Sequence, residues 1–167
     1  VITDGTTLTI GSGITVTGQA GTIGFNPLFG GNTNVSVVNN GTIAIQNASL
    51  NGAIQNAGII NPGGNAAGQI QIVGSYEQVS SGTLEIEIGG LTQTSQYDHV
   101  QISGNASFDG TVRVTILGGF LPQSGDSFEF ITCSSVTGAF TDLIAPDLGI
   151  VQLGLSYGAT TAKLSAS

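Results

Sequence analysis

The chain has 167 residues, including 27 glycines, and its formal net charge is -8 although only 7% of its residues are charged. Arg113 and Lys163 are its two basic residues, too few to neutralise the phosphates of a nucleic acid or to hold the chain on an anionic membrane. A hydrophobic fraction of 40% argues against intrinsic disorder, and the length fits one domain or two small ones.

The 72 residues from Gly5 to Tyr76 contain no acidic or basic residue and no histidine. Asn, Gln, Thr, Ser and Gly interrupt this stretch every few residues, so no run approaches the roughly 20 apolar residues of a membrane helix. We therefore predict no membrane span. The start at Val1 without Met and the low lysine content favour an exported protein, extracellular or on the cell surface after removal of a signal peptide.

Apolar and polar residues alternate along most of the chain, and Gly or Pro interrupts nearly every window in which a helical period could develop. Such alternation predicts short strands with one buried face. In chain order these strands are 8–10, 14–16, 35–37, 43–45, 70–72, 84–88, 112–116, 128–130 and 151–153. We predict an all-β protein with at most a short helical turn near 142–147.

The first half of the chain is repetitive. Gly-Thr-Ile or a close variant begins a strand at residues 21, 41, 58, 68 and 82, with spacings of 10 to 20 residues that suit the coils of a β-solenoid. Ten of the eleven asparagines precede residue 66, and asparagine can form hydrogen-bonded ladders between stacked coils. Stacking brings equivalent side chains to about 4.8 Å, where like charges repel, which explains the uncharged stretch.

The composition changes near residue 91, where charges return and aromatic residues become frequent. Turn residues now separate strands at intervals of roughly 8 to 15 residues, which is typical of an antiparallel sandwich. We therefore predict two parts: residues 1–90 form parallel β-helix coils, and residues 91–167 form an antiparallel, sandwich-like β cap that covers the open end of the solenoid.

Several passages resemble the C-terminal regions of bacterial secreted β-helix proteins, such as autotransporter-like passengers and haemagglutinin-like surface proteins. The similar passages begin with Asn61-Pro62-Gly63-Gly64 and Gly82-Thr83-Leu84-Glu85-Ile86-Glu87-Ile88-Gly89-Gly90, and continue with Tyr97-Asp98-His99-Val100 and Phe108-Asp109-Gly110-Thr111-Val112. The resemblance covers roughly residues 56–143. It implies an extracellular, right-handed parallel β-helix that ends in a β cap and has an adhesive, structural or scaffolding role.

The acidic residues offer little catalytic chemistry. Glu85 and Glu87 alternate with apolar residues, so both carboxylates project from one strand face about 6.5 to 7 Å apart, which overlaps the separation in inverting glycosidases. A solvated outer face explains the same pattern, and we prefer that interpretation. Asp98 and His99 are adjacent and would face opposite ways on a strand, so we interpret Asp98 as a turn or cap residue.

Other candidate sites are equally sparse. Acidic residues 109, 126, 142 and 147 occur singly, without a calcium or zinc spacing, and no phosphate loop is present. Cys133 is the only cysteine and is interpreted as an inert core residue, and Lys163 as an exposed lysine on the last strand rather than an isopeptide partner. We predict no catalytic, cofactor-binding or metal-binding residues and no cofactor.

Three functions remain open. The favoured one is an extracellular structural protein whose copies associate into a fibre, sheath or surface layer through strand edges, with residues 1–10 or 160–167 as candidate edges. The alternative is an adhesin or glycan-binding module, although the chain has few aromatic residues for stacking on sugars. A polysaccharide-degrading enzyme is the least favoured, because residues 5–76 contain no acid or base.

Overall fold

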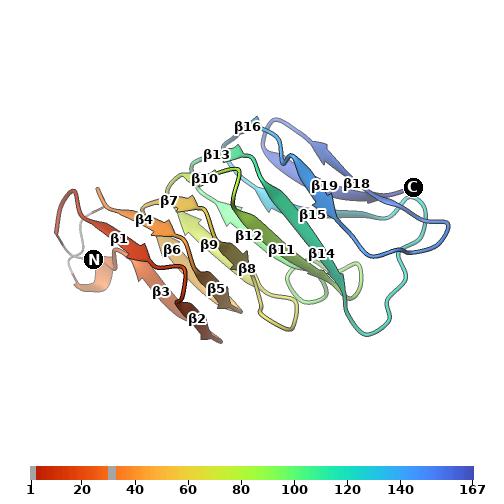
Figure 1. Ribbon diagram of the computed structural model, residues 1–167, viewed down its shortest axis with the longest axis horizontal. Helices are drawn as coiled ribbons and strands as arrows, with labels where there is room; N and C mark the ends of the chain where they lie inside the picture. The colour runs from red at the N-terminus through yellow and green to blue at the C-terminus, as the bar shows by residue number, and fades with distance from the viewer. Residues whose placement is uncertain (1–2, 30–32) are drawn as a thin grey trace.

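A computed structural model of the chain describes residues 3–29 and 33–167. Successive strands pass in turn to three sheets, so the chain winds as a parallel β-solenoid whose coils stack along the long axis of the molecule (Figure 1). The first coil lies at the end that carries the N-terminus, and the last strands lie at the opposite end. The prediction of an all-β fold with a parallel β-solenoid is confirmed.

Each sheet takes every third strand of the solenoid. Sheet A contains β1 (Thr7–Ile10), β4 (Ser36–Asn39), β7 (Ala53–Asn56), β10 (Tyr76–Gln78), β13 (Asn105–Phe108) and β16 (Ser135–Gly138). Sheet B contains β2 (Thr15–Gly18), β5 (Thr42–Ile45), β8 (Ile59–Asn61), β11 (Thr83–Ile88), β14 (Thr111–Ile116) and β17 (Asp142–Ile144). Sheet C contains β3 (Gly21–Gly24), β6 (Asn47–Asn51), β9 (Gln69–Val73), β12 (His99–Ile102), β15 (Ser127–Thr132), β19 (Thr161–Ala166) and β18 (Leu153–Tyr157).

The coils differ in length but keep their register. Equivalent residues are 17 apart between Asn39 and Asn56, and 30 apart between Asn105 and Ser135. The extra residues form the connections between sheets, because the strands themselves stay short. Loops can vary in this way since the stacking depends on the paired strands alone.

Glycine columns allow the tight corners between the sheets. A side chain at Gly58 would place its Cβ 2.2 Å from the carbonyl oxygen of Gly41 in the coil before it. At Gly74, where φ is +144°, a Cβ would lie 2.0 Å from the carbonyl oxygen of Gly52. Only glycine permits such close backbone stacking, which explains the glycines that precede the strands at residues 41, 58, 68 and 82, whereas Gly21 has no atom close to its Cβ position.

Inside the coils, apolar residues of the three sheets form one continuous core. In sheet B, Ile43, Ile60, Leu84 and Val112 follow one another in register and are completely or almost completely buried. Val16 begins this row in the first coil and is only partly buried, because no described coil covers it. The core is therefore closed along its length but open at the N-terminal end.

A ladder of buried amides occupies the corner between sheets A and B. Asn39 donates to Asn56 at 2.8 Å, and Asn56 donates to Gln78 at 3.3 Å. The same amides also donate to backbone carbonyls, as Asn39 does to Ile59 at 3.0 Å. The prediction that asparagines form ladders between coils is thus confirmed at this corner.

The last coils replace the ladder with aromatic rings. Phe108 stacks on Phe140 with ring centroids 4.6 Å apart, and Tyr157 lies 6.3 Å from Phe140. The hydroxyl of Tyr157 accepts a hydrogen bond from the backbone N–H of Phe140 at 2.9 Å. Phe128, completely buried, makes an edge contact with Tyr97 at 5.5 Å.

Among the strands of the described residues, antiparallel pairing occurs at the end of sheet C, apart from isolated bridges such as the one between Ile88 and Tyr97. Strand β19 pairs antiparallel with both β15 and β18, so a hairpin closes this sheet (Figure 1). Strands β12 to β17 instead pair parallel with the coil before them. The expected change from parallel to antiparallel pairing after residue 90 is wrong for these strands. Their apolar and aromatic core residues still alternate with polar ones, and each strand stays in register with the coil before it. The expected change is right for residues 153–166.

Two further expectations need correction. Residues 142–147 contain strand β17 rather than a helical turn, and the one helical segment among the described residues is the short 3-10 helix Pro27–Phe29. The polar strands β6, β7, β10, β13 and β16 lacked a clear apolar alternation and were not anticipated. They form because neighbouring coils supply hydrogen-bond partners, on both sides for β6, β7, β10 and β13 and on one side for β16 at the end of sheet A.

Candidate functional site

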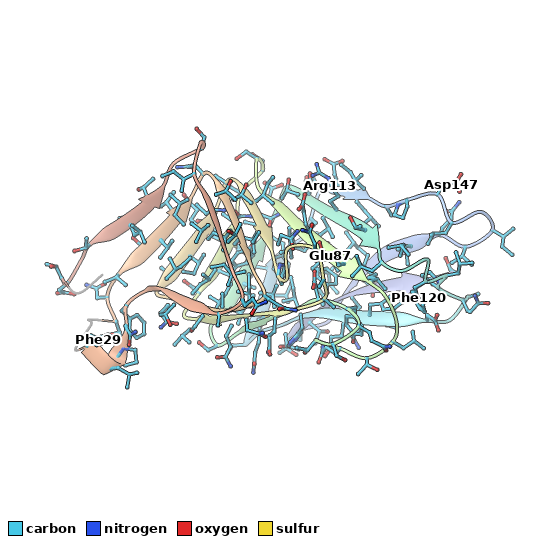
Figure 2. All side chains as sticks on the ribbon, turned by 90° about the horizontal axis from the view of Figure 1, so that it is seen from below. Phe29, Glu87, Arg113, Phe120 and Asp147 are labelled. Carbon is cyan, nitrogen blue, oxygen red and sulfur yellow. The ribbon has the colours of Figure 1, made fainter. Side chains whose placement is uncertain are left out.

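The first coil presents the open end of the solenoid. Strands β1, β2 and β3 each pair with one neighbour, β4, β5 and β6, and lie at the edges of their sheets in the part of the chain that the structure describes. Exposed apolar side chains stand at this end, including Ile14, Leu28 and Phe29. Phe29 projects at the extreme end of the molecule (Figure 2).

The candidate edge at residues 1–10 coincides with this end. Strand β1 is an edge strand as predicted, whereas Val1 and Ile2 lie outside the described residues. The second candidate, residues 160–167, is wrong, because β19 has a partner on each side and offers no free edge. The hairpin geometry places β18 at the edge of sheet C instead.

A polar cluster lies on the outer face of sheet B, midway between the ends (Figure 2). The Arg113 guanidinium donates from Nη1 to Oε1 of Glu85 at 2.7 Å, and both side chains are partly exposed. Asn61 donates from Nδ2 to Oε2 of Glu85 at 3.1 Å and to Oε1 of Glu87 at 3.0 Å. The prediction that Glu85 and Glu87 share one strand face is therefore confirmed.

Glu87 is not solvated, contrary to the preferred interpretation of this pair. It is 5% exposed, and burial raises the pKa of its carboxyl above the ordinary value. The chain turns back over it after β11, so that the N–H of Asp98 donates to the carbonyl of Glu87 at 3.1 Å. This return is fixed by tertiary contacts, which strand alternation does not encode.

Asp98 precedes β12 and is completely buried. Its Oδ1 accepts a hydrogen bond from the N–H of Gly68 at 2.7 Å, and its Oδ2 accepts one from the N–H of Glu87 at 2.8 Å. Burial and the neighbouring Glu87 raise the pKa of Asp98 to about 9. Asp98 thus ties the connection that precedes β9 to strand β11, and its position between β11 and β12 agrees with a turn role.

His99 and Cys133 are not brought into a catalytic arrangement with these acids. His99 contacts Thr132, with Nε2 and Oγ1 3.1 Å apart, and burial lowers its pKa. Cys133 is half-buried, and its Sγ lies 3.4 Å from the carbonyl oxygen of Ser135. Lys163 pairs with Glu129 at 3.0 Å, so both basic residues of the chain are held by an acid of an adjacent strand.

A shallow, uncharged groove of about 390 Å³ lies on sheet C near the first coil. Its lining carries hydroxyl and amide groups from three successive strands: Gly21, Thr22, Asn47, Ala48, Ser49, Gln69 and Gln71. Gln71 and Gln69 each donate to Gln101, at 3.4 and 3.3 Å, so the rim of this surface is ordered by an amide ladder.

The described residues contain no group of three or more His, Cys, Asp or Glu side chains that could hold a metal ion. Within residues 3–29 and 33–167, no helix has the length and apolar character needed to cross a membrane. Comparison of the sequence with protein-family models gives no match, and comparison with curated protein sequences gives no significant match. The resemblance to bacterial secreted β-helix proteins stays a prediction.

Proposed function

We propose that the protein is an extracellular structural protein whose copies associate through the strand edges of the first coil. The observation that carries this proposal is that β1, β2 and β3 end their three sheets at the same level of the solenoid. A second coil of similar shape can extend all three ladders at once, which satisfies three rows of backbone groups together.

The composition of this end supports the proposal. The first coil contains Asp4 as its single charged residue, and the next acid along the chain is Glu77. Edge strands that avoid pairing usually carry lysine, proline or inward-facing charge, and β1 to β3 carry none of these. Little electrostatic repulsion therefore opposes the approach of a second coil.

The opposite end differs, and this difference limits how copies can assemble. There the β18–β19 hairpin turns sheet C antiparallel, and the backbone N–H of Val136 in β16 donates to the carbonyl of Ala159. A coil cannot extend all three sheets at that end. A contact between the first coils of two copies joins like ends and forms a closed dimer. A fibre or layer therefore needs a second contact surface.

Analytical ultracentrifugation of the 167-residue chain over a range of concentrations tests the proposal. We expect association in the wild type, loss of association in Val16→Lys, which places a charge in the open end of the core, and no effect of Ile144→Lys on β17. Ile144 is 51% exposed and is the matched control at the other end. A wild type that stays monomeric at high concentration contradicts the proposal.

The groove on sheet C supports the second candidate, a glycan-binding module. Uncharged hydroxyl and amide groups suit the hydroxyls of sugars, although none of the groove's lining residues is aromatic. The test is a glycan array followed by titration of the best ligand against wild type and Gln71→Ala. Absence of any bound glycan eliminates this function.

Neither proposal includes catalysis. The glutamate pair has the residue types of a glycosidase, but Glu87 is buried beneath the following chain segment and has no open path to a sugar ring.

A further inference from the structure

The strongest unexplained feature of the molecule is the contact between two buried acids. Glu87 is 5% exposed and Asp98 is completely buried, and their carboxyl groups lie within hydrogen-bonding reach of each other. A hydrogen bond between two carboxyls requires a proton on one of them, because two carboxylates have no hydrogen to share. Neither acid has an ion-pair partner among the described residues.

The hydrogen bonds around the pair indicate where this proton lies. Both oxygens of Asp98 already accept backbone N–H groups, from Gly68 and Glu87, and Oε1 of Glu87 accepts from Asn61. Oε2 of Glu87 is buried and has no other partner in the described structure. A proton on Asp98 that is donated to Oε2 of Glu87 gives this oxygen its missing partner, and this direction agrees with the raised pKa of Asp98.

We propose that Glu87 and Asp98 share one proton at neutral pH, and that this proton is a latch that holds residues 89–98 against the solenoid. The proton leaves to solvent when the pH rises, and two buried carboxylates then repel each other. The latch is therefore closed in neutral and acidic solution and released in alkaline solution.

The segment that the latch holds spans two sheets. Residues 89–98 connect β11 in sheet B to β12 in sheet C. Within the segment, Gln93 donates from its side chain to the carbonyl of Glu129 in β15 at 2.7 Å, and Thr94 has a φ of +71°. A positive φ costs free energy at a residue other than glycine, and the contacts of the segment offset this cost.

The other charged and titratable groups near the pair lie on the same strand, beside Asp98 and on β15. Glu85 lies on the same strand and is paired with Arg113 of β14. His99 and Tyr97 flank Asp98, and Glu129 of β15 influences the pKa of both and is paired with Lys163 of β19. The loop at residues 62–68 contributes no titratable group.

The sign of the pH effect follows from the raised pKa values. The pKa of Asp98 is about 9 in the folded chain and ordinary in the unfolded chain, so between these values the folded state holds one more proton. The stabilisation is complete below the unfolded pKa and is lost as the pH rises through the folded pKa. For one proton, the folding equilibrium constant falls tenfold per pH unit.

The test compares wild type with Glu87→Gln, whose amide can donate to Asp98 without a titrating proton, and with Glu85→Gln as the matched control on the same strand. Between pH 6.5 and 8.5 we expect about a hundredfold fall in the folding equilibrium constant for wild type and Glu85→Gln, and a clearly smaller fall for Glu87→Gln. This window limits the contributions of lysine and tyrosine titration. Equal slopes in all three proteins overturn the proposal.

A direct measurement keeps the proposal testable if Glu87→Gln fails to fold. Infrared spectroscopy of the wild type at pH 7 detects the C=O stretch of a protonated carboxyl, and we expect this band to disappear in alkaline solution. Exchange of the amide hydrogens of Gly68 and Glu87, which Asp98 binds, is expected to accelerate over the same pH range beyond the ordinary base-catalysed rate. Absence of the band at pH 7 overturns the proposal.

Discussion

The two ends of the solenoid fill their interior in different ways. At the corner between sheets A and B, the early coils place Asn39, Asn56 and Gln78, whereas the last coils place Phe108 and Phe140 in the core. A buried amide needs a partner in the next coil, while an aromatic ring needs only contact. The amide ladder therefore requires a further coil, whereas the aromatic rings allow the stack of coils to end.

The coil at which the amide ladder gives way to aromatic rings shows how the ladder ends. Gln78 and Phe108 occupy equivalent positions in adjacent coils. Each directly follows one residue of the pair Glu77 and Ser107, which lie opposite each other. The amide of Gln78 turns to the backbone instead and donates to the carbonyls of Asp109 and Thr111, each at 3.0 Å. The ladder is thus completed before the first ring, and no amide of this corner is left without a partner in the described structure.

The largest effect is expected from the aromatic end. Phe128→Ala removes a completely buried ring that contacts Tyr97 and Phe120, and we expect it to lower the free energy of unfolding by about 3–5 kcal/mol. Phe29→Ala is the control at the other end, where the side chain is 79% exposed and the expected change is below about 0.5 kcal/mol. Denaturant titration measures both, and similar losses would contradict the packing described for the last coils.

A smaller effect is expected from the ladder. Asn56→Ala deprives Asn39 of an acceptor and Gln78 of a donor within the core, which we expect to cost about 1–3 kcal/mol. Asn65→Ala, at an exposed position, serves as the control and should change stability by less than about 0.5 kcal/mol. If the two variants unfold at the same denaturant concentration, the ladder contributes nothing to stability.

The smallest effect sharpens the comparison between a covered and an open coil. Val112→Ala and Val16→Ala make the same change in equivalent rows of sheet B, but Val112 is completely buried and Val16 only partly. We expect losses of about 2 kcal/mol and below about 1 kcal/mol in dilute solution. If copies associate through the first coil, the loss at Val16 should grow with protein concentration, and thermal unfolding over a concentration series measures this growth.

The alternation of residues such as Leu84, Glu85 and Ile86 was sufficient to predict strands and their buried faces, because a strand places successive side chains on opposite sides. Repeated glycines and asparagines predicted stacked coils for a similar local reason. The extent of the parallel coils was not predictable in this way. Residues 99–144 carry charges and rings that suit either kind of sheet, and only pairing with the preceding coil makes them parallel.

The acidic cluster shows the same limit. Alternation correctly placed Glu85 and Glu87 on one face, but it could not indicate that the chain returns over Glu87. A weak signal was present in the Gly89-Gly90 pair, which permits a turn directly after the strand. Whether a turn covers the strand or leaves it depends on Gln93 and Tyr97 reaching β15, a strand some thirty residues further along the chain.

By itself, the sequence determined the all-β class, the turn positions and the polar ladder, because each depends on a residue's own geometry or on a short repeat. The tertiary structure alone decided that β19 inserts between β15 and β18, that three edges end together at the first coil, and that Asp98 meets Glu87. These contacts join distant parts of the chain, and their free energy exists only once the coils have stacked.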